Sequence, residues 1–283
     1  MKKYRLGLYE KAVPANLTLK EKIILAKKYN YDFIELSIDE TDEKLARLEW
    51  TDNEINAIKR LLEEEKFFIQ SFCLSGHRRF PLGSESEEIQ KKSLEIMEKA
   101  IILAHKLGVR YIQIAGYDEY YNESNEKTKA NFIKNLKKSV DIAATYGVIL
   151  AFETMETNFL NTCAKAKYYI DLINSPYLKI YPDIANITNA FNGSSERTIN
   201  DLKTHANEIV AAHLKEGLPN QYRNLLFGDG YVDFDNIIKT LIENNIYLFV
   251  AEFWYLENAD WEINLEKTNK FLREKIEEVF SWK

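Results

Sequence analysis

The chain has 283 residues, of which 46% are hydrophobic and only 10 are glycine and 5 proline, so it predicts a globular protein with a sizeable core. Its formal net charge is −6, from 38 basic and 44 acidic side chains. This balance argues against a nucleic-acid groove, which normally leaves a basic footprint.

Signals for export and for disulfide chemistry are weak. The first residues, MKKYRLGLYE, include two lysines but lack the apolar stretch of a signal peptide, and no apolar run approaches the length of a membrane span. Cys73 and Cys163 have neither metal-site spacing nor the density of a disulfide framework. We therefore expect a soluble, cytoplasmic protein with two reduced thiols, and neither a membrane nor a nucleic acid as a partner.

Short apolar runs alternate with longer helix-patterned runs eight times along the chain. The predicted strands are residues 4–10, 32–38, 67–73, 111–116, 148–154, 178–184, 209–215 and 248–254. The helices predicted to follow them are, in the same order, residues 17–29, 51–65, 86–107, 125–146, 162–173, 196–207, 234–244 and 261–279. Thr51 is the expected N-cap of the second helix, and Gly108 and Gly147 are expected to end the third and fourth. Pro182 predicts a break or bulge near the end of the sixth strand.

Eight βα units in series predict a single closed (β/α)₈ barrel, or TIM barrel, over residues 1–283. Such barrels commonly need about 250 residues, so the length fits one domain. A doubly wound open sheet is the structural alternative. It would normally place a GxGxxG motif after the first strand, and residues 6–15 contain none.

Four of the later strands each end on a potential metal ligand. Glu153, Asp183, His213 and Glu252 follow apolar runs at intervals of 30 (153 to 183), 30 (183 to 213) and 39 (213 to 252) residues, close to the length of a βα unit. Strand ends converge on the active site of a TIM barrel. A buried carboxylate needs a metal, a cation or a raised pKa, although one alone often serves as a helix cap. We predict one divalent ion, Mn²⁺, Mg²⁺ or Co²⁺, with Zn²⁺ also compatible.

Motifs in several separate loops resemble those of one enzyme family. LGLYEKA, IELSIDETDE, CLSGHRRFPLGSE, IQIAGYDEYY, YPDIAN and FGDGYVDF are similar to motifs of the L-ribulose-5-phosphate 3-epimerases, also known as L-xylulose-5-phosphate 3-epimerases of L-ascorbate utilisation. The resemblance extends from Leu6 to the last helix. It implies a xylose-isomerase-like barrel, a metal bound by Glu153, Asp183, His213 and Glu252, and interconversion of L-ribulose 5-phosphate and L-xylulose 5-phosphate.

The residues suit this chemistry. Epimerisation beside a ketone removes a proton from C3 and returns one on the opposite face. Glu153 and Glu252 belong to the fifth and eighth strands, so they can lie across the site as catalytic base and acid. A metal at the C2 and C3 oxygens would stabilise the enediolate, and Asp183 and His213 would fix that metal. A neutral imidazole also needs a hydrogen-bond acceptor to set its tautomer, which the sequence does not identify.

The loop after the third strand is the first candidate for binding a sugar phosphate. It contains Ser75, His77 and Arg78 on the predicted site face, and arginine recognises phosphate well. His77 is also compatible with contact to a sugar hydroxyl. A solvated surface loop or an interface salt bridge is the alternative interpretation.

Further substrate contacts are predicted elsewhere. Lys215, with the backbone of Gly228 and Gly230, is a second phosphate candidate. Glu156 lies three residues beyond Glu153 and is expected to support the site.

Two positions depart from the pattern of related 3-epimerases that act on free ketoses. Those enzymes carry a histidine three residues after the metal-binding aspartate and an arginine six after the metal-binding histidine. This chain has Asn186 and Pro219 there. The difference favours another, phosphorylated substrate.

Other polar and aromatic residues have two interpretations each. Three charged residues at the ends of the first two strands either line the pocket or form caps and salt bridges: Glu10, Lys11 and Glu35. Three tyrosines after the fourth strand either roof the sugar or pack at a subunit interface: Tyr117, Tyr120 and Tyr121. A homo-oligomer, dimer or higher, is expected.

Three other functions compete with the epimerase. An aldose–ketose isomerase on the same scaffold would move hydrogen between C1 and C2, commonly with two metals. An abasic-site endonuclease needs more histidines for its three-metal cluster than the four present, of which His105 and His205 fall in predicted helices and are expected to be structural. A metal-dependent sugar-binding protein would bind the ligand without exchanging its C3 proton.

Overall fold

Eight parallel strands form one sheet in the order β6-β5-β4-β3-β2-β1-β8-β7 in the computed structural model, which describes residues 3–257 and 260–281. Their bounds are β1 (Arg5–Tyr9), β2 (Phe33–Ile38), β3 (Ile69–Leu74), β4 (Tyr111–Ala115), β5 (Ile149–Glu153), β6 (Leu178–Ile180), β7 (Ala212–Leu214) and β8 (Leu248–Ala251). Two isolated parallel bridges join the outer strands, Ile180 with Ile209 and Asp183 with His213. The sheet therefore closes into the predicted barrel.

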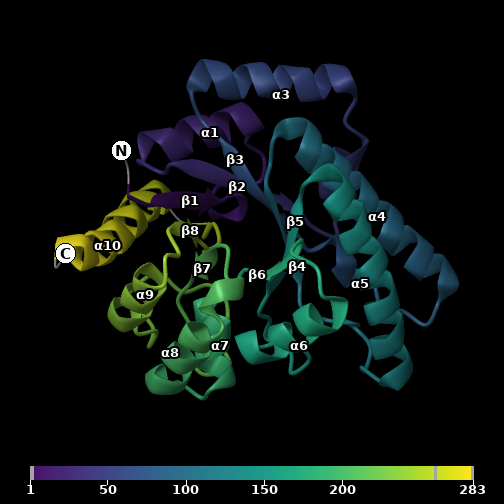
Figure 1. Ribbon diagram of the computed structural model, residues 1–283. Helices are drawn as coiled ribbons and strands as arrows, with labels where there is room; N and C mark the ends of the chain where they lie inside the picture. The colour runs from purple at the N-terminus through teal and green to yellow at the C-terminus, as the bar shows by residue number, and fades with distance from the viewer. Residues whose placement is uncertain (1–2, 258–259, 282–283) are drawn as a thin grey trace.

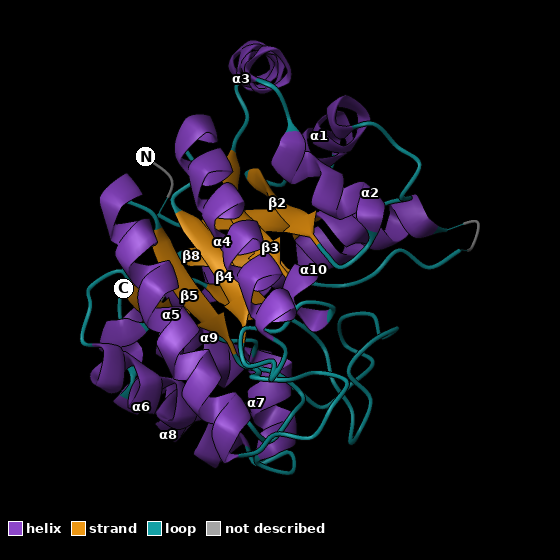
Figure 2. Cartoon of the chain, turned by 90° about the vertical axis from the view of Figure 1, so that its right-hand side faces the viewer, coloured by secondary structure: helices purple, strands orange, loops and turns teal. Residues whose placement is uncertain are grey.

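Helices surround this barrel (Figure 1). They are α1 (Leu19–Lys28), α2 (Asp42–Leu45), α3 (Asp52–Glu65), α4 (Glu87–Leu107), α5 (Glu126–Tyr146), α6 (Cys163–Ile173), α7 (Ile184–Ala190), α8 (Ser195–Thr204), α9 (Phe234–Glu243) and α10 (Trp261–Ser281). Short 3₁₀ turns are η1 (Glu10–Ala12), η2 (Ala46–Glu49), η3 (Gly76–Arg78) and η4 (Ala206–Glu208). Figure 2 shows long loops gathered at the arrowhead ends of the strands, opposite the two termini.

The three predicted helix-end residues agree with the structure, whereas the helix predicted over residues 196–207 already ends at Thr204. Thr51 caps α3 with a reciprocal capping box, in which its side chain accepts from the Glu54 backbone and Glu54 accepts from the Thr51 backbone. Gly108 (φ 73°) and Gly147 (φ 68°) end α4 and α5 in the left-handed conformation that glycine adopts without steric cost. The sequence thus carried enough information for the long helices.

The region after β6 differs from the prediction. Strand six was expected to reach residue 184, but β6 ends at Ile180, and residues 184–190 form α7, a helix that was not predicted. The break predicted at Pro182 is confirmed, because β6 ends two residues before it. Proline has no backbone N–H to donate to the neighbouring strand. Asp183 then begins the helix, because its Oδ1 accepts from the backbone of Ala185 (2.9 Å) and Asn186 (3.0 Å).

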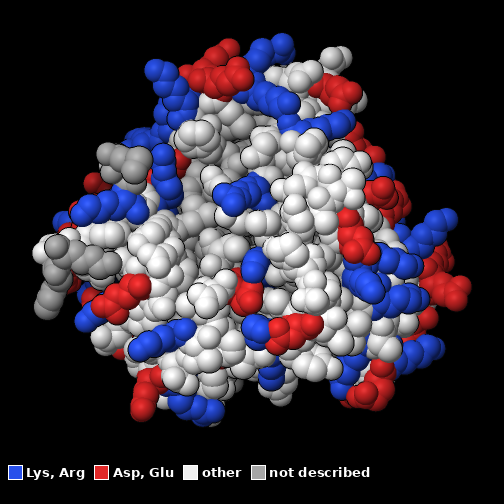
Figure 3. All heavy atoms as spheres, viewed as in Figure 1, with Lys and Arg blue, Asp and Glu red and all other residues white. Residues whose placement is uncertain are grey.

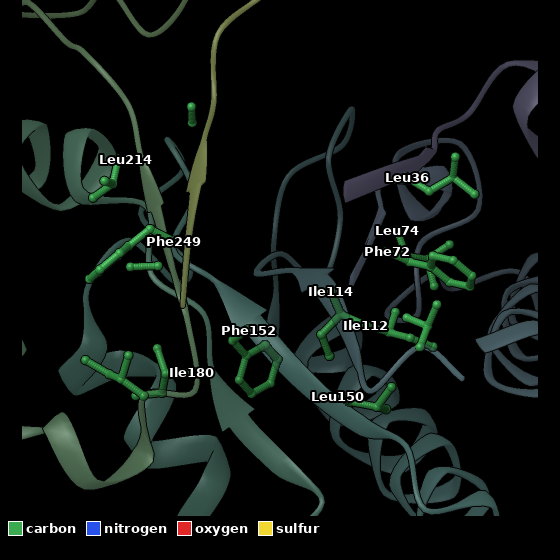
Figure 4. Packing of buried hydrophobic residues seen from close by; sticks show 14 of the residues in the cluster. Leu36, Phe72, Leu74, Ile112, Ile114, Leu150, Phe152, Ile180, Leu214 and Phe249 are labelled. Carbon is green, nitrogen blue, oxygen red and sulfur yellow. The ribbon is translucent and has the colours of Figure 1, made fainter. Parts of the chain in front are cut away.

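Side-chain alternation along the strands separates two layers of core. On β5, Leu150 and Phe152 pack in the large core between sheet and helices, whereas Ala151 belongs to a smaller cluster with Tyr181 and Val250. Figure 4 shows the large core around Phe152. Since successive side chains point to opposite faces, Glu153 shares the inward face of Ala151. The strand period therefore aims this carboxylate into the barrel.

Phe152 is expected to contribute strongly to stability. It is fully buried, and its ring centroid lies 6.3 Å from that of Phe132 and 6.1 Å from that of Tyr169. Phe152→Ala should lower the free energy of unfolding by about 3–5 kcal/mol in urea denaturation. Tyr168→Ala, at a site 60% exposed, should change it by less than about 0.5 kcal/mol. A similar small loss for both variants would contradict this packing.

Candidate metal centre

The four predicted ligands meet at the C-terminal ends of their strands. Glu153 ends β5, Asp183 follows β6, His213 lies on β7 and Glu252 follows β8. All four are buried, and one ligand atom from each lies within 4.8 Å of those of the others. The barrel therefore assembles three carboxylates and one imidazole from four consecutive strands.

Asp183 is held in one orientation. Its Oδ1 caps α7, and its backbone N–H donates to Thr154 Oγ1 (2.9 Å), which in turn donates to the Asp183 carbonyl (3.1 Å). Its other carboxylate oxygen, Oδ2, contacts the ammonium group of Lys215. Because Oδ1 is used in the helix cap, Oδ2 is the carboxylate oxygen that faces the metal centre.

Glu35 supplies the acceptor that the sequence could not identify. His213 Nε2 lies 2.5 Å from Glu35 Oε1, while Ser71 Oγ donates to Glu35 Oε2 (2.5 Å). His213 Nδ1 faces the opposite way, 2.8 Å from Glu252 Oε2 and 3.8 Å from Glu153 Oε1. Of the two interpretations of Glu35, the structure therefore favours the one in which it lines the pocket. There it orients the imidazole so that Nδ1 faces the other ligands.

The charges of this cluster fit a divalent cation. Three buried carboxylates, Glu35, Glu153 and Glu252, lie against the His213 imidazole, and a fourth, Asp183, contacts the buried ammonium of Lys215. Buried charges require compensation. Hard oxygen donors with one imidazole nitrogen suit Mn²⁺, Mg²⁺, Co²⁺ or Zn²⁺. The residues present therefore match one divalent metal ion.

Burial and mutual repulsion shift the pKa values of these groups. Burial, together with the nearby Glu252 carboxylate, raises the pKa of Glu153 to about 8. Burial likewise raises the pKa of Asp183 to about 7, although Lys215 opposes it. The pKa of Glu252 is lowered, because Lys215 and His213 outweigh its burial. The pKa of His213 is raised because Glu35 and Glu252 outweigh the effect of burial.

These shifts predict a pH-dependent stability of the metal-free protein. Folded-state pKa values above the unfolded ones mean that Glu153, Asp183 and His213 bind more protons when folded, so stability falls as pH rises. In EDTA, the free energy of unfolding should decline between pH 6.5 and 8 by on the order of 1–2 kcal/mol. Saturating Mn²⁺ should remove this decline, since it binds the deprotonated ligands. A metal-free stability that rises over this interval would contradict the assignment.

The candidate phosphate-binding residues in the loop after β3 point in different directions. Arg78 is partly buried, its guanidinium lies 4.8 Å from the Tyr120 ring centroid, and its Nε has no hydrogen-bond partner among residues 3–257 and 260–281. Ser75 is buried at the start of η3. His77 instead turns toward α4, where its Nε2 lies 3.1 Å from the Ser93 carbonyl oxygen. Arg79 pairs with Asp42 on the exposed surface.

Tyrosines after β4 lie beside Arg78. Tyr117 is buried with no partner for its hydroxyl in the described part of the chain, and its ring centroid lies 5.0 Å from that of Tyr120. The Tyr120 hydroxyl donates to Glu156 Oε1 (3.1 Å). Tyr121 is 67% exposed and donates to Glu40. Arg78, Tyr117, Tyr120 and Glu156 thus form one polar and aromatic group.

The second predicted phosphate site is not formed. Lys215 faces the metal ligands rather than the glycine loop. The Gly228 backbone N–H donates to Glu216 Oε2 (3.0 Å), and a Cβ on Gly230 would lie 2.3 Å from Glu216 Oε1. The buried Glu216 carboxylate therefore occupies the space and the donor that a phosphate would need.

Glu10 and Lys11 form salt bridges. Glu10 is buried and accepts from Lys22 (2.9 Å), Lys44 (3.1 Å) and Arg47 (2.5 Å and 2.6 Å), whereas Lys11 pairs with Asp39. Tyr9 belongs to the inner cluster, so alternation turns the next residue outward. Of the two interpretations, the structure supports salt bridges for both.

Figure 3 shows how the charged side chains are distributed on one face of the molecule. On the face that carries both termini, acidic and basic side chains are interspersed around the rim (Figure 3). Within residues 3–257 and 260–281, none of the helices has both the length and the apolar character that a bilayer span requires.

This closed barrel with ligands at its strand ends is a xylose isomerase-like TIM barrel, since a sequence profile of that description matches residues 23–275. L-ribulose-5-phosphate 3-epimerase UlaE of Escherichia coli (strain SMS-3-5 / SECEC) is 38% identical over 276 residues, 97% of this chain and 96% of the relative. UlaE of Salmonella heidelberg (strain SL476) is 40% identical over 254 residues, 89% and 88% of the two chains. The chain belongs to the L-ribulose-5-phosphate 3-epimerase family.

Solved structures support the same fold. The crystal structure of D-psicose 3-epimerase in the presence of D-fructose aligns with a TM-score of 0.80 at 16% sequence identity, covering 96% of this chain and 99% of that one. At this level of identity the similarity concerns the fold alone.

Proposed function

We propose that this protein interconverts L-ribulose 5-phosphate and L-xylulose 5-phosphate by removing and returning the C3 proton. The observation that carries the proposal is the meeting of two buried carboxylates from separate strands, Glu153 and Glu252, in one ligand cluster. Membership of the epimerase family supports the substrate class.

Each residue of the centre has a role in the proposed reaction. One of the two glutamates takes the C3 proton, and the other gives a proton to the opposite face, with their roles exchanged in the reverse direction. Glu153, Asp183, His213 and Glu252 hold a divalent ion, which when bound stabilises negative charge on the substrate oxygens. Glu35 keeps the imidazole in the tautomer that leaves Nδ1 available.

Conversion of each substrate provides the test. Metal-loaded protein is incubated with L-ribulose 5-phosphate, and the product is identified by NMR. L-xylulose 5-phosphate is the expected product, with free L-ribulose turned over more slowly. An aldose phosphate would indicate an isomerase, and faster turnover of the free ketose would indicate a free-ketose 3-epimerase. Binding without turnover would indicate a sugar-binding protein.

Arg78 is the residue we propose for the phosphate, with Ser75 beside it and Glu156 and Tyr120 bordering the group. Its buried Nε has no hydrogen-bond partner among the described residues, and arginine donors match phosphate geometry. Arg78→Met should raise KM for L-ribulose 5-phosphate at least tenfold and leave KM for free L-ribulose unchanged. Arg79→Met is the matched control, because Arg79 pairs with Asp42 at the surface. Equal effects on both substrates would exclude phosphate contact.

His77 has the weakest support among the proposed substrate contacts, because its ring hydrogen-bonds toward α4. The predicted homo-oligomer is a separate expectation, which light scattering in solution would measure.

A further inference from the structure

One ammonium group lies among the metal ligands. Lys215 directly follows β7 and is 5% exposed. Its Nζ contacts Asp183 Oδ2 and lies 3.8 Å from Glu252 Oε2. Lysine is rarely buried unless paired. This position therefore places a desolvated positive charge beside a carboxylate that handles the C3 proton in the proposed reaction.

The hydrogen bonds of this ammonium leave one donor over. A lysine ammonium has three N–H donors. One donates to Asn186 Oδ1 at 2.9 Å, and the ammonium also forms an ion pair with Asp183 Oδ2, an atom without a hydrogen-bond partner among the described residues. Glu252 Oε2, at 3.8 Å, is beyond hydrogen-bond distance. One N–H thus stays available to an oxygen atom of a molecule bound beside Glu252.

Asn186 fixes the direction of that donor. It is buried on α7, where its Nδ2 donates to the Thr154 carbonyl (2.8 Å) while its Oδ1 accepts from Lys215. Since Asp183 caps the same helix, Asn186 and Asp183 are held on one element. The amide is bonded at both ends, so it holds Lys215 Nζ against the strand-end carboxylates.

We propose that Lys215 is a catalytic residue that donates a hydrogen bond to the C2 oxygen of the ketose, and that Asn186 is the residue that positions it. This inference rests on the proposed epimerase activity. When C3 loses its proton, negative charge develops on the oxygen atom bonded to C2, the carbon next to C3. A preorganised, water-excluded cation acts most strongly where charge develops. Lys215 keeps its own proton throughout, and the proton transfers stay with the two glutamates.

Lys215→Met tests the donor. The variant should lower kcat about 10²–10³-fold and slow C3 proton exchange in D₂O equally. Its dissociation constant for Mn²⁺, measured by competition with a chelating dye, should be equal to or lower than that of the wild type, because a positive charge beside the ligands is removed. Lys179→Met is the matched control, since Lys179 on β6 pairs with Glu208, and its kcat should be unchanged.

Asn186→Leu tests the positioning role through a double-mutant cycle. It should lower kcat about tenfold on its own, yet add less than twofold to Lys215→Met, because Asn186 acts through the lysine. Independent, multiplying effects would overturn the positioning role. A wild-type kcat in Lys215→Met, or a loss explained by weaker Mn²⁺ binding, would overturn the catalytic role. If the wild type does not epimerise the substrate, the proposed function itself fails.

Discussion

Glu252→Gln is expected to lower kcat for epimerisation by about 10²–10⁴-fold, the usual contribution of a positioned acid or base. Glutamine keeps a ligand oxygen and nearly the same shape, but it cannot take up or release the C3 proton. Glu252 is buried next to His213 (2.8 Å), so solvent water has little access to replace it. Glu153→Gln should cause a loss of the same order, because each direction of reaction needs both groups.

Steady-state rates at saturating metal separate this role from metal binding. Each variant is assayed with Mn²⁺ well above its own dissociation constant, so that every molecule carries the ion. Glu243→Gln, an exposed substitution on α9, should retain full activity as the control. If either active-site glutamine variant retained more than a tenth of wild-type kcat when metal-saturated, that residue would not be the acid or base.

Glu35→Leu is expected to weaken metal binding about 10–100-fold, the typical effect of removing the partner of a metal-binding histidine. Without the Glu35 carboxylate, His213 Nε2 still lies 3.1 Å from Gln113 Nε2, but an amide nitrogen donates and cannot accept the imidazole proton. The Nε2–H tautomer therefore loses its acceptor, and Nδ1 is less often the free nitrogen. Glu35→Gln should cost less, because its amide oxygen still accepts from Nε2.

Direct titration of the metal checks this order. The dissociation constant for Mn²⁺ should increase from wild type through Glu35→Gln to Glu35→Leu, with circular dichroism confirming that the variants are folded. Equal affinities in all three proteins would mean that Glu35 plays no part in orienting the imidazole.

The meeting of the four candidate ligands was predictable, because it depends on local rules. Each of the four ligands ends an apolar run, and the run spacing matches a βα unit, so the barrel architecture alone brings them to one end. The strand period also explains why Glu153 faces inward beside Ala151. These signals need no knowledge of the packing between distant segments.

Other parts of the site depend on contacts that sequence spacing does not encode. Glu35 lies 178 residues from His213 and meets it only because the barrel closes. Glu10 also follows a strand, but alternation turns it outward to three cations. Helix α7 was missed because Asp183 serves as helix cap and ligand candidate at once. Lys215 was assigned to a phosphate, whereas the geometry places it against Asp183.

Deuterium incorporation is the most direct measurement of the central claim, that carboxylates from two strands exchange the C3 proton of a ketose phosphate at a metal centre. Metal-loaded protein is incubated with L-ribulose 5-phosphate in D₂O, and the label is located by NMR. We predict deuterium at C3 in substrate and product for the wild type. When either glutamate at position 153 or 252 is replaced by glutamine, labelled product should be lost, and the variant that keeps the base facing the C3 hydrogen of L-ribulose 5-phosphate should label the substrate alone. Deuterium at C1 with none at C3 would contradict the account.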